Sequence, residues 1–167
     1  MDRRALFALL ALLPIQARAQ CQLCKPTAKA EAAPPGRALT IEIQSSLNFS
    51  RVAQKGSGSG SVIVNERSGA RSVSGGLVDL GGMSLKGSVR LTGDPLRHIR
   101  ISLPSSIRLT SADGGSAEVV DLRTDLPGDP ALDATGSLNF SFGGRLVVSG
   151  GTSGDLRGRI PIVADYQ

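Results

Sequence analysis

The sequence predicts an all-β protein, an immunoglobulin-like antiparallel β-sandwich of about nine strands. Short runs of alternating apolar and polar residues recur along the chain, as expected for strands with one buried face. The 167 residues include 21 glycines and 9 prolines, which favour turns over helices. Aromatic residues make up only 3% of the chain, so Val, Leu and Ile must fill the core. Val and Ile suit strands because their branched side chains are stiff.

Residues 1–19 have the pattern of a cleaved signal peptide. A basic start at Arg3-Arg4 precedes the apolar run 5–13, and Ala17-Arg18-Ala19 offers a small-x-small cleavage site. The apolar run is too short to span a bilayer. We therefore expect a mature chain that begins at Gln20, has no transmembrane segment and is exported to the periplasm, the cell surface or the medium.

Residues 20–38 form a predicted flexible linker rich in proline and alanine. It holds the only two cysteines, Cys21 and Cys24, at C-x-x-C spacing. A redox pair usually opens a helix, but Pro26 follows here, and a zinc site would need more ligands. We expect a disulfide in an oxidising compartment, either as a local loop or between molecules. Lipid attachment at Cys21 is the alternative, although Gln20 stands where a small residue is usual.

The predicted β-sandwich domain covers residues 39–167, and its first half contains four alternating segments. Leu39–Ile43 and Val62–Val64 read as strands. In Arg71–Leu80 the pair Gly75-Gly76 suggests a bulge or bend. Met83–Leu91 is the longest clean alternation, so we expect a central strand there.

The second half continues the pattern with shorter runs. Ile99–Leu103 and Ile107–Leu109 alternate, and Ala112–Gly115 predicts a hairpin turn in which glycine supplies a positive φ. In the segment 120–126, Val120, Leu122, Thr124 and Leu126 are expected to share one face.

The last strands follow a loop. We expect the strand Leu138–Phe142 to end in a turn at Gly143-Gly144 and the chain to return as Leu146–Val148. The final alternation, Ile160–Tyr166, contains Pro161, which predicts an edge strand or a bulge.

The segment Leu126–Ala134 is predicted to be a long polar loop. Asp125, Asp129 and Asp133 repeat every four residues, so three carboxylates are available for calcium. The EF-hand spacing is missing, and the prolines of the loop break any helix that would align the carboxylates. A solvated loop is the simpler prediction, and we expect no metal or cofactor site.

Charge and composition argue against a nucleic-acid partner. Loss of residues 1–19 removes three arginines and one aspartate, so the formal charge falls from +5 to +3. Arg100 and Arg108 lie on the exposed side of their predicted strands without aromatic neighbours for base stacking. Export would also separate the protein from nucleic acid.

Four short motifs follow one another along the chain: LTGDP (91–95), ISLPSSIRLT (101–110), LDATGSLNFSFGGRLVVSGG (132–151) and RIPIVADYQ (159–167). Taken in this order, they resemble an exported bacterial family labelled domain of unknown function 4402. LNFS (47–50) is similar to an early Leu-Asn-Phe-Gly strand of the family, and Leu156 stands where the family often has tyrosine. The resemblance implies a secreted immunoglobulin-like sandwich, loosely similar to fimbrial subunits, and implies no reaction and no catalytic residue.

We expect a non-enzymatic structural or interaction protein of the cell envelope or surface, such as a fimbria-like subunit or adhesin. The single histidine, His98, lies on the exposed side of a strand, which leaves little for general base catalysis. A periplasmic small-ligand or glycan-binding module is the alternative, although Trp is absent and Tyr166 is the only Tyr. A carboxylate-dependent hydrolase ranks third.

We also expect a domain that is complete without a donated strand. Residues 20–38 do not alternate apolar side chains over a strand's length, and their prolines lack backbone donors. Self-association should therefore use strand edges or the tail cysteines.

Overall fold

The structure is a computed structural model that describes residues 36–167, and these residues form an antiparallel β-sandwich. This confirms the all-β prediction. Two of its eleven strands, β2 and β5, have only three residues each. The part of the chain that is described contains no helix that could span a bilayer. The strands are β1 (Thr40–Ser45), β2 (Val52–Gln54), β3 (Gly60–Val64), β4 (Arg71–Gly75), β5 (Leu77–Asp79), β6 (Gly87–Thr92), β7 (Ile99–Ser102), β8 (Ser106–Thr110), β9 (Ser116–Thr124), β10 (Ser137–Val148) and β11 (Val163–Tyr166).

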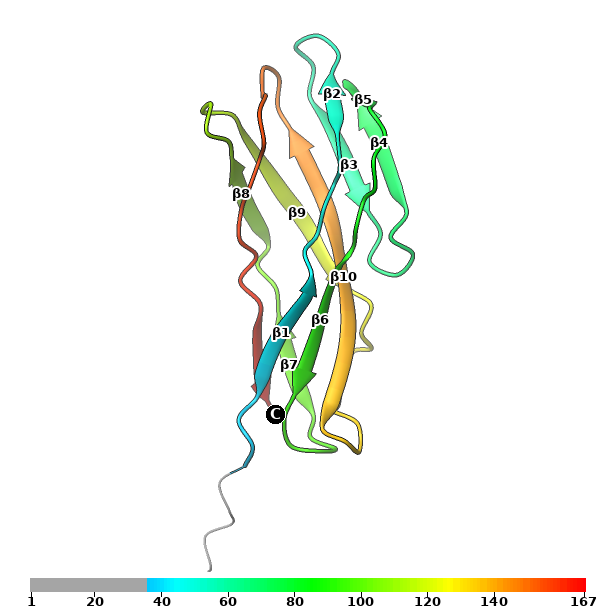
Figure 1. The fold of residues 1–167 in the computed structure, drawn as a ribbon, viewed down its shortest axis with the longest axis vertical. Coiled ribbons are helices and arrows are strands. Elements are labelled where there is room, and N and C mark those ends of the chain that lie inside the picture. Colours follow the sequence, from blue (N-terminus) through cyan, green and yellow to red (C-terminus); the bar gives the residue numbers. More distant parts are fainter. Residues whose placement is uncertain (1–35) are drawn as a thin grey trace, which may run out of the picture. The chain divides into compact units, whose positions relative to one another are not determined.

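The long strand β10 organises the domain (Figure 1). On one edge its first half pairs with β6 and its second half with β3, while β9 pairs with the opposite edge of the second half. β1, β4 and β8 extend these pairs to a seven-stranded sheet. Two small sheets, β7–β11 and β2–β5, complete the sandwich.

Two hydrophobic clusters lie along β10, one for each half of the strand. The first half contributes Phe140 and Phe142, and the second contributes Leu146 and Val148. Leu47 and Leu122 pack against both clusters. Full burial of one such side chain contributes about 1.5–3 kcal/mol. The first cluster also contains Val89, Leu91, Ile99 and Leu132, and the second also contains Phe49, Val62, Val64, Leu77, Ala117 and Val119.

The predicted turn at Gly143-Gly144 is wrong, because β10 runs through both residues without interruption. Neither glycine has a positive φ. A Cβ on Gly143 would instead collide with main-chain atoms of Val64 and Glu66, where the chain leaves β3. Gly143 is needed because another segment of the chain passes close to it. In the sequence, a glycine required for close packing looks the same as a glycine required for a turn.

β9 contains a bulge that its alternation does not reveal. The register between β9 and β10 slips in the middle of the pair. Asp121 has a φ of 53°, and its carboxylate forms an ion pair with Arg145 at 2.9 Å. Val119 is buried before the bulge and Leu122 packs into the core after it. The expectation that Val120 shares a face with Leu122 is therefore wrong, because the bulge reverses the parity of the strand.

Two predicted breaks in the strands are confirmed. Gly75, the last residue of β4, has a φ of 72°, and only Gly76 separates it from β5, as expected for a bend. The turn between β8 and β9 contains Gly114 with a φ of 82°, and the Ser111 amide donates to the Gly115 carbonyl at 2.9 Å. Glycine tolerates both conformations because it has no Cβ.

The predicted central strand is shorter than the run of alternating residues Met83–Leu91 that predicted it. β6 begins only at Gly87, and it lies between β1 and β10 as expected. Leu85 makes only an isolated bridge with Asn48, and the Met83 side chain is 77% exposed. The segment 80–86 connects the β2–β5 sheet to the seven-stranded sheet, so its alternating apolar residues have no layer to cover them.

The last strand is an edge strand, as Pro161 predicted. β11 pairs only with β7 and begins after the proline. Ile160 and Ile162 precede the strand and pack against the first hydrophobic cluster. Ala164 and Tyr166 of β11 pack against the same cluster, so the C-terminal alternation contributes to the core both before and within its ladder.

Tyr166 connects the two ends of the described chain. Its hydroxyl donates to the Arg37 carbonyl at 2.8 Å and accepts from the Asp94 amide at 2.7 Å. The Arg97 guanidinium lies 4.9 Å from the ring centroid, within reach of a cation–π contact. These contacts fasten the residues before β1 to β11 and to the loop after β6.

Candidate functional site

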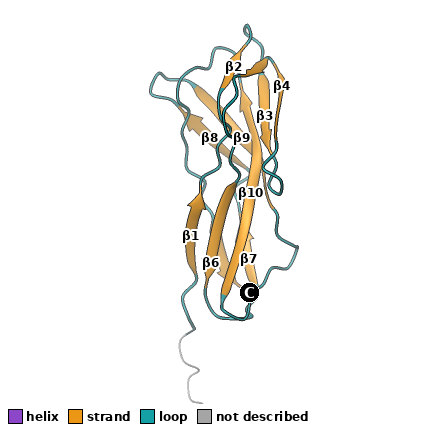
Figure 2. Ribbon diagram, turned by 45° about the vertical axis from the view of Figure 1, so that its right-hand side comes forward, coloured by secondary structure: helices purple, strands orange, loops and turns teal. Residues whose placement is uncertain are grey.

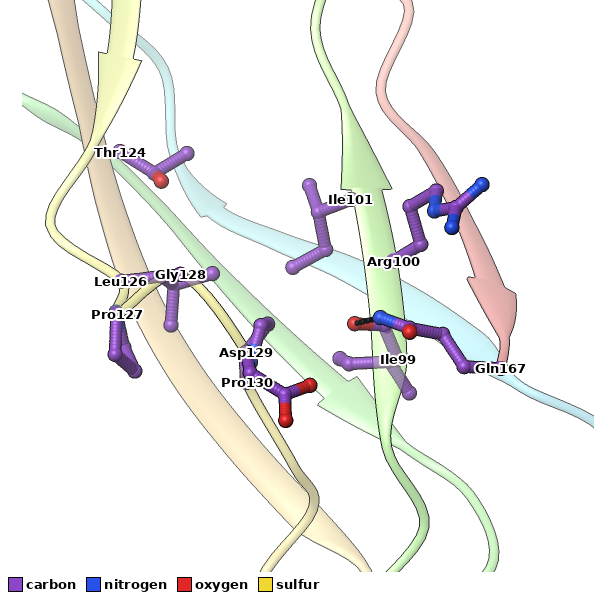
Figure 3. A pocket seen from close by; sticks show the side chains of 10 residues that line it. All are labelled: Ile99, Arg100, Ile101, Thr124, Leu126, Pro127, Gly128, Asp129, Pro130 and Gln167. Carbon is purple, nitrogen blue, oxygen red and sulfur yellow. Dashed lines mark hydrogen bonds between the residues drawn. The ribbon is translucent and has the colours of Figure 1, made fainter.

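A cavity of about 410 Å³ lies between β7 and the loop that joins β9 to β10 (Figure 3). We call the cavity and the adjoining edge of β7 the β7 groove. Its apolar lining residues are two isoleucines of β7 and, from the loop, Leu126 and two prolines. The residues that line it are Ile99, Arg100, Ile101, Thr124, Leu126, Pro127, Gly128, Asp129, Pro130 and Gln167.

The main chain of β7 has one paired edge and one partly open edge. The Gln167 amide donates to the His98 carbonyl at 3.0 Å, which shows that even-numbered residues face β11. Because successive residues of a strand direct their main-chain groups to opposite edges, the N–H and C=O groups of Ile99 and Ile101 point toward the cavity. The Ile99 amide donates there to the Pro130 carbonyl at 2.9 Å.

The pairing on the cavity side stops after this point. His98 and Ala131 form an isolated bridge, and continuing its register would place Gly128 opposite Ile101. Instead, the Ile99 carbonyl accepts a hydrogen bond from the Gln167 side-chain amide at 3.0 Å. Among the strands described, only β11 pairs with β7, so the N–H and C=O of Ile101 face the cavity without a strand partner.

Two prolines account for the separation of the loop from β7. Pro127 and Pro130 have no N–H and fix their φ, so the segment between them is poorly suited to continue a ladder. The sequence predicted a polar, solvated loop, but part of this loop is buried. Pro130 is buried and Leu132 is only 2% exposed. Leu132 anchors the far end of the loop in the core.

The polar groups at the groove form an ordinary surface pair. His98 Nδ1 lies 3.0 Å from Asp129 Oδ1, and the side chains are 56% and 68% exposed. Such exposure gives no low-dielectric setting that would tune a base or a nucleophile. The single histidine therefore sits on the exposed surface, as the alternation predicted.

The three aspartates of the calcium hypothesis have separate roles. The Asp125 carboxylate accepts from the Ser141 amide at 2.8 Å, and Asp129 faces His98. Asp133 accepts from the Thr135 hydroxyl at 2.6 Å. Residues 36–167 contain no cluster of three metal-ligating side chains.

Asp133 organises its own turn. Its carboxylate also accepts from the amides of Thr135 and Ser137, at 2.8 and 2.9 Å. The hydrogen bond from the Thr135 hydroxyl, followed by that from the Ser137 amide, lowers the pKa of Asp133 below its ordinary value. The Asp133 carboxylate therefore stabilises the turn that precedes β10.

Several arginines within residues 36–167 have an acidic neighbour. Arg100 and Arg108 are exposed, as predicted, and Arg108 stands opposite Glu118 in the β8–β9 ladder. Arg157 pairs with Asp155 at 2.6 Å on the surface. Neighbouring carboxylates thus offset the charge of Arg108 and Arg157 locally.

Cys21 and Cys24, with the predicted signal peptide and most of the linker, lie outside the described residues. The β7 groove was not predicted from the sequence. Its local signal is a pair of prolines, Pro127 and Pro130, in a loop that follows a strand.

Comparison with known proteins gives one family. The model of the family described as Domain of unknown function (DUF4402) matches residues 39–166. No curated protein and no solved structure matches the chain. Because the match covers most of the chain, this protein belongs to the DUF4402 family.

Proposed function

We propose that the protein is an exported, non-enzymatic interaction protein of the cell envelope, which binds an extended segment of another polypeptide in the β7 groove. The observation that supports this function is the main chain of Ile101, whose donor and acceptor face a cavity of about 410 Å³. A fimbria-like subunit or an adhesin is the form of this function that we favour.

The groove suits a strand better than a compact ligand. An extended peptide can supply both an acceptor for the Ile101 N–H and a donor for its C=O. Pairing would be short, because the Ile99 carbonyl is already occupied by Gln167. Side chains of a bound strand alternate between two faces, so every second one would enter the space lined by Ile99, Ile101 and Leu126. We therefore expect small apolar residues at those positions.

A glycan is the less favoured ligand. Carbohydrate sites commonly present an aromatic platform, and none of the ten residues that line the groove is aromatic. Arg100, Thr124 and Asp129 still offer polar contacts at its rim. Binding of a sugar without any effect on the Ile101 amide would support this alternative.

The binding test uses the purified protein and a short capped peptide of alternating valine and serine. We expect shifts of the groove resonances and slower hydrogen exchange of the Ile101 amide as the peptide approaches about 1 mM, a range suited to weak binding. Gly128→Phe should prevent both effects, because no heavy atom lies within 4 Å of a Cβ at this position and a larger side chain would enter the cavity.

Gly58→Phe is the matched control. This glycine also lacks a positive φ and would bring its Cβ no closer than 3.9 Å to another residue, but it does not line the groove. Peptide binding by the Gly128→Phe variant at wild-type strength, or an Ile101 amide indifferent to the peptide, would contradict the proposed site.

Export is tested separately by cell fractionation and intact mass. We expect the protein outside the cytosol with Gln20 as its first residue, because the predicted cleavage site ends at Ala19. A mass that still contains residues 1–19, or that includes lipid on Cys21, would contradict the predicted processing.

A further inference from the structure

We infer, building on the proposed function, that the Gln167 side chain is a displaceable cap on the β7 groove and that the bound polypeptide runs parallel to β7. Figure 2 shows the end of the chain marked C beside β7, where Gln167 follows β11. The Gln167 main-chain amide bonds to the His98 carbonyl on the β11 side of β7. Its side chain crosses β7 and donates to the Ile99 carbonyl on the cavity side (Figure 3).

A missing main-chain donor explains why Gln167 occupies this carbonyl. The isolated antiparallel bridge between His98 and Ala131 places Pro130 beside Ile99, and the Ile99 amide donates to the Pro130 carbonyl at 2.9 Å. A regular antiparallel ladder would return a hydrogen bond from residue 130 to the Ile99 carbonyl. Proline has no N–H, so this bond cannot form. The primary amide of Gln167 donates instead at 3.0 Å, as the N–H of a peptide group would.

The Gln167 side chain can leave the groove without disturbing the strands. Gln167 is an exposed residue, and its side-chain amide is held by the hydrogen bond to the Ile99 carbonyl. Holding a long side chain in one rotamer loses conformational entropy, which offsets much of the net gain from a single hydrogen bond. The main-chain bond from Gln167 to His98, at 3.0 Å, stays in place when the side chain moves.

The occupied amide of Ile99 selects the direction of the bound strand. In an antiparallel pair, the ligand residue opposite Ile99 would direct both its N–H and its C=O at Ile99. That C=O would meet the Pro130 carbonyl, which already accepts the Ile99 N–H. In a parallel pair, the ligand residue opposite Arg100 donates to the Ile99 carbonyl and accepts from the Ile101 N–H. A parallel strand therefore replaces the Gln167 amide without needing the Ile99 amide.

The parallel register also assigns the side chains of the bound segment. Arg100 is exposed, so the ligand residue opposite it directs its side chain toward solvent. The residues on either side of that ligand residue point to the other face, beside Ile99 and Ile101 and toward Leu126. The preferred ligand is therefore an extended segment in which a polar residue stands between two small apolar residues.

The affinity test titrates the capped valine–serine peptide into wild-type protein and into Gln167→Ala. Removal of the competing hydrogen bond should tighten peptide binding by about 2- to 12-fold. In the wild-type protein, the peptide should shift the side-chain NH₂ resonances of Gln167 and accelerate their exchange with water, because the cap is released. Gln44→Ala is the matched control, since Gln44 is an exposed glutamine of β1 and does not line the groove. Thermal unfolding checks that both variants fold.

A nitroxide label on the peptide reports the direction of the bound strand. β7 runs from Ile99 to Ser102. A label at the peptide N-terminus should therefore broaden the amide resonance of Ile99 more strongly than that of Ser102. A label at the peptide C-terminus should give the reverse.

Equal affinity of the peptide for the wild-type protein and for Gln167→Ala would overturn the cap. The opposite pattern of broadening would overturn the parallel direction. Either result would leave the proposed function intact, because the peptide would still bind in the β7 groove. Absence of peptide binding to both proteins would contradict the proposed function as well.

Discussion

Replacing Tyr166 by Phe removes a single hydroxyl that connects both ends of the domain. The hydroxyl bonds to Arg37 before β1 and to Asp94 after β6. Phe retains the ring, so its packing against the first hydrophobic cluster and its contact with the Arg97 guanidinium are preserved. The substitution therefore isolates the hydrogen bonds from the burial of the ring.

The expected loss in the free energy of unfolding follows from the two hydrogen bonds of the Tyr166 hydroxyl. A neutral hydrogen bond contributes about 0.5–1.5 kcal/mol net, and a donor left without a partner costs more when it is buried. The bond from the Asp94 amide is partly buried, whereas the bond to the Arg37 carbonyl is exposed and water can replace it. We therefore expect Tyr166→Phe to lower the free energy of unfolding by about 1–2 kcal/mol.

Urea denaturation measures this loss as a lower midpoint with an unchanged slope. Trypsin supplies a local readout, because its cleavage after Arg37 should accelerate when the segment is released. Asp94→Ala is the matched variant, since the Asp94 carboxylate accepts from the Arg37 amide at 2.7 Å. The two substitutions should be less than additive, because both release the same segment. A change below about 0.5 kcal/mol with unaltered cleavage would refute the reasoning.

Three further outcomes are expected. Replacing Cys21 and Cys24 by Ser should change the free energy of unfolding by less than about 0.5 kcal/mol, since a disulfide between them closes a very short loop; calorimetry showing a large loss would contradict this. Gly143→Ala should destabilise by about 1–3 kcal/mol in urea titrations, because its Cβ would meet the main chain of Val64. The lowered pKa of Asp133 stabilises the fold above the ordinary value of 3.8, and this contribution is lost as pH falls through the lowered native pKa. Asp133→Asn should reduce that acid dependence, as measured by unfolding midpoints across the acid range, whereas an unchanged profile would show that the carboxylate contributes nothing.

The sequence alone determined the fold class and the positions of most strands. Alternation over Ile99–Ser102 and the glycine turn at Gly114 are local signals, because side-chain parity and positive φ depend on neighbouring residues. The ordered motifs also identified the family. Self-association through strand edges was predicted without naming the strand, since edges are defined only by pairing.

Tertiary structure decided the features that depend on distant partners. Gly143 lies within a strand because a segment leaving β3 crosses it closely, and the bulge at Asp121 exists only in relation to β10. The β7 groove arises where the Pro127 loop stands away from β7, and the outermost place of β1 follows from the sheet order. Side-chain periodicity reports which face of a strand is buried, whereas main-chain pairing is set by strands far away in sequence. The candidate site consists of unpaired main-chain groups, so its location could be determined only after the chain was folded.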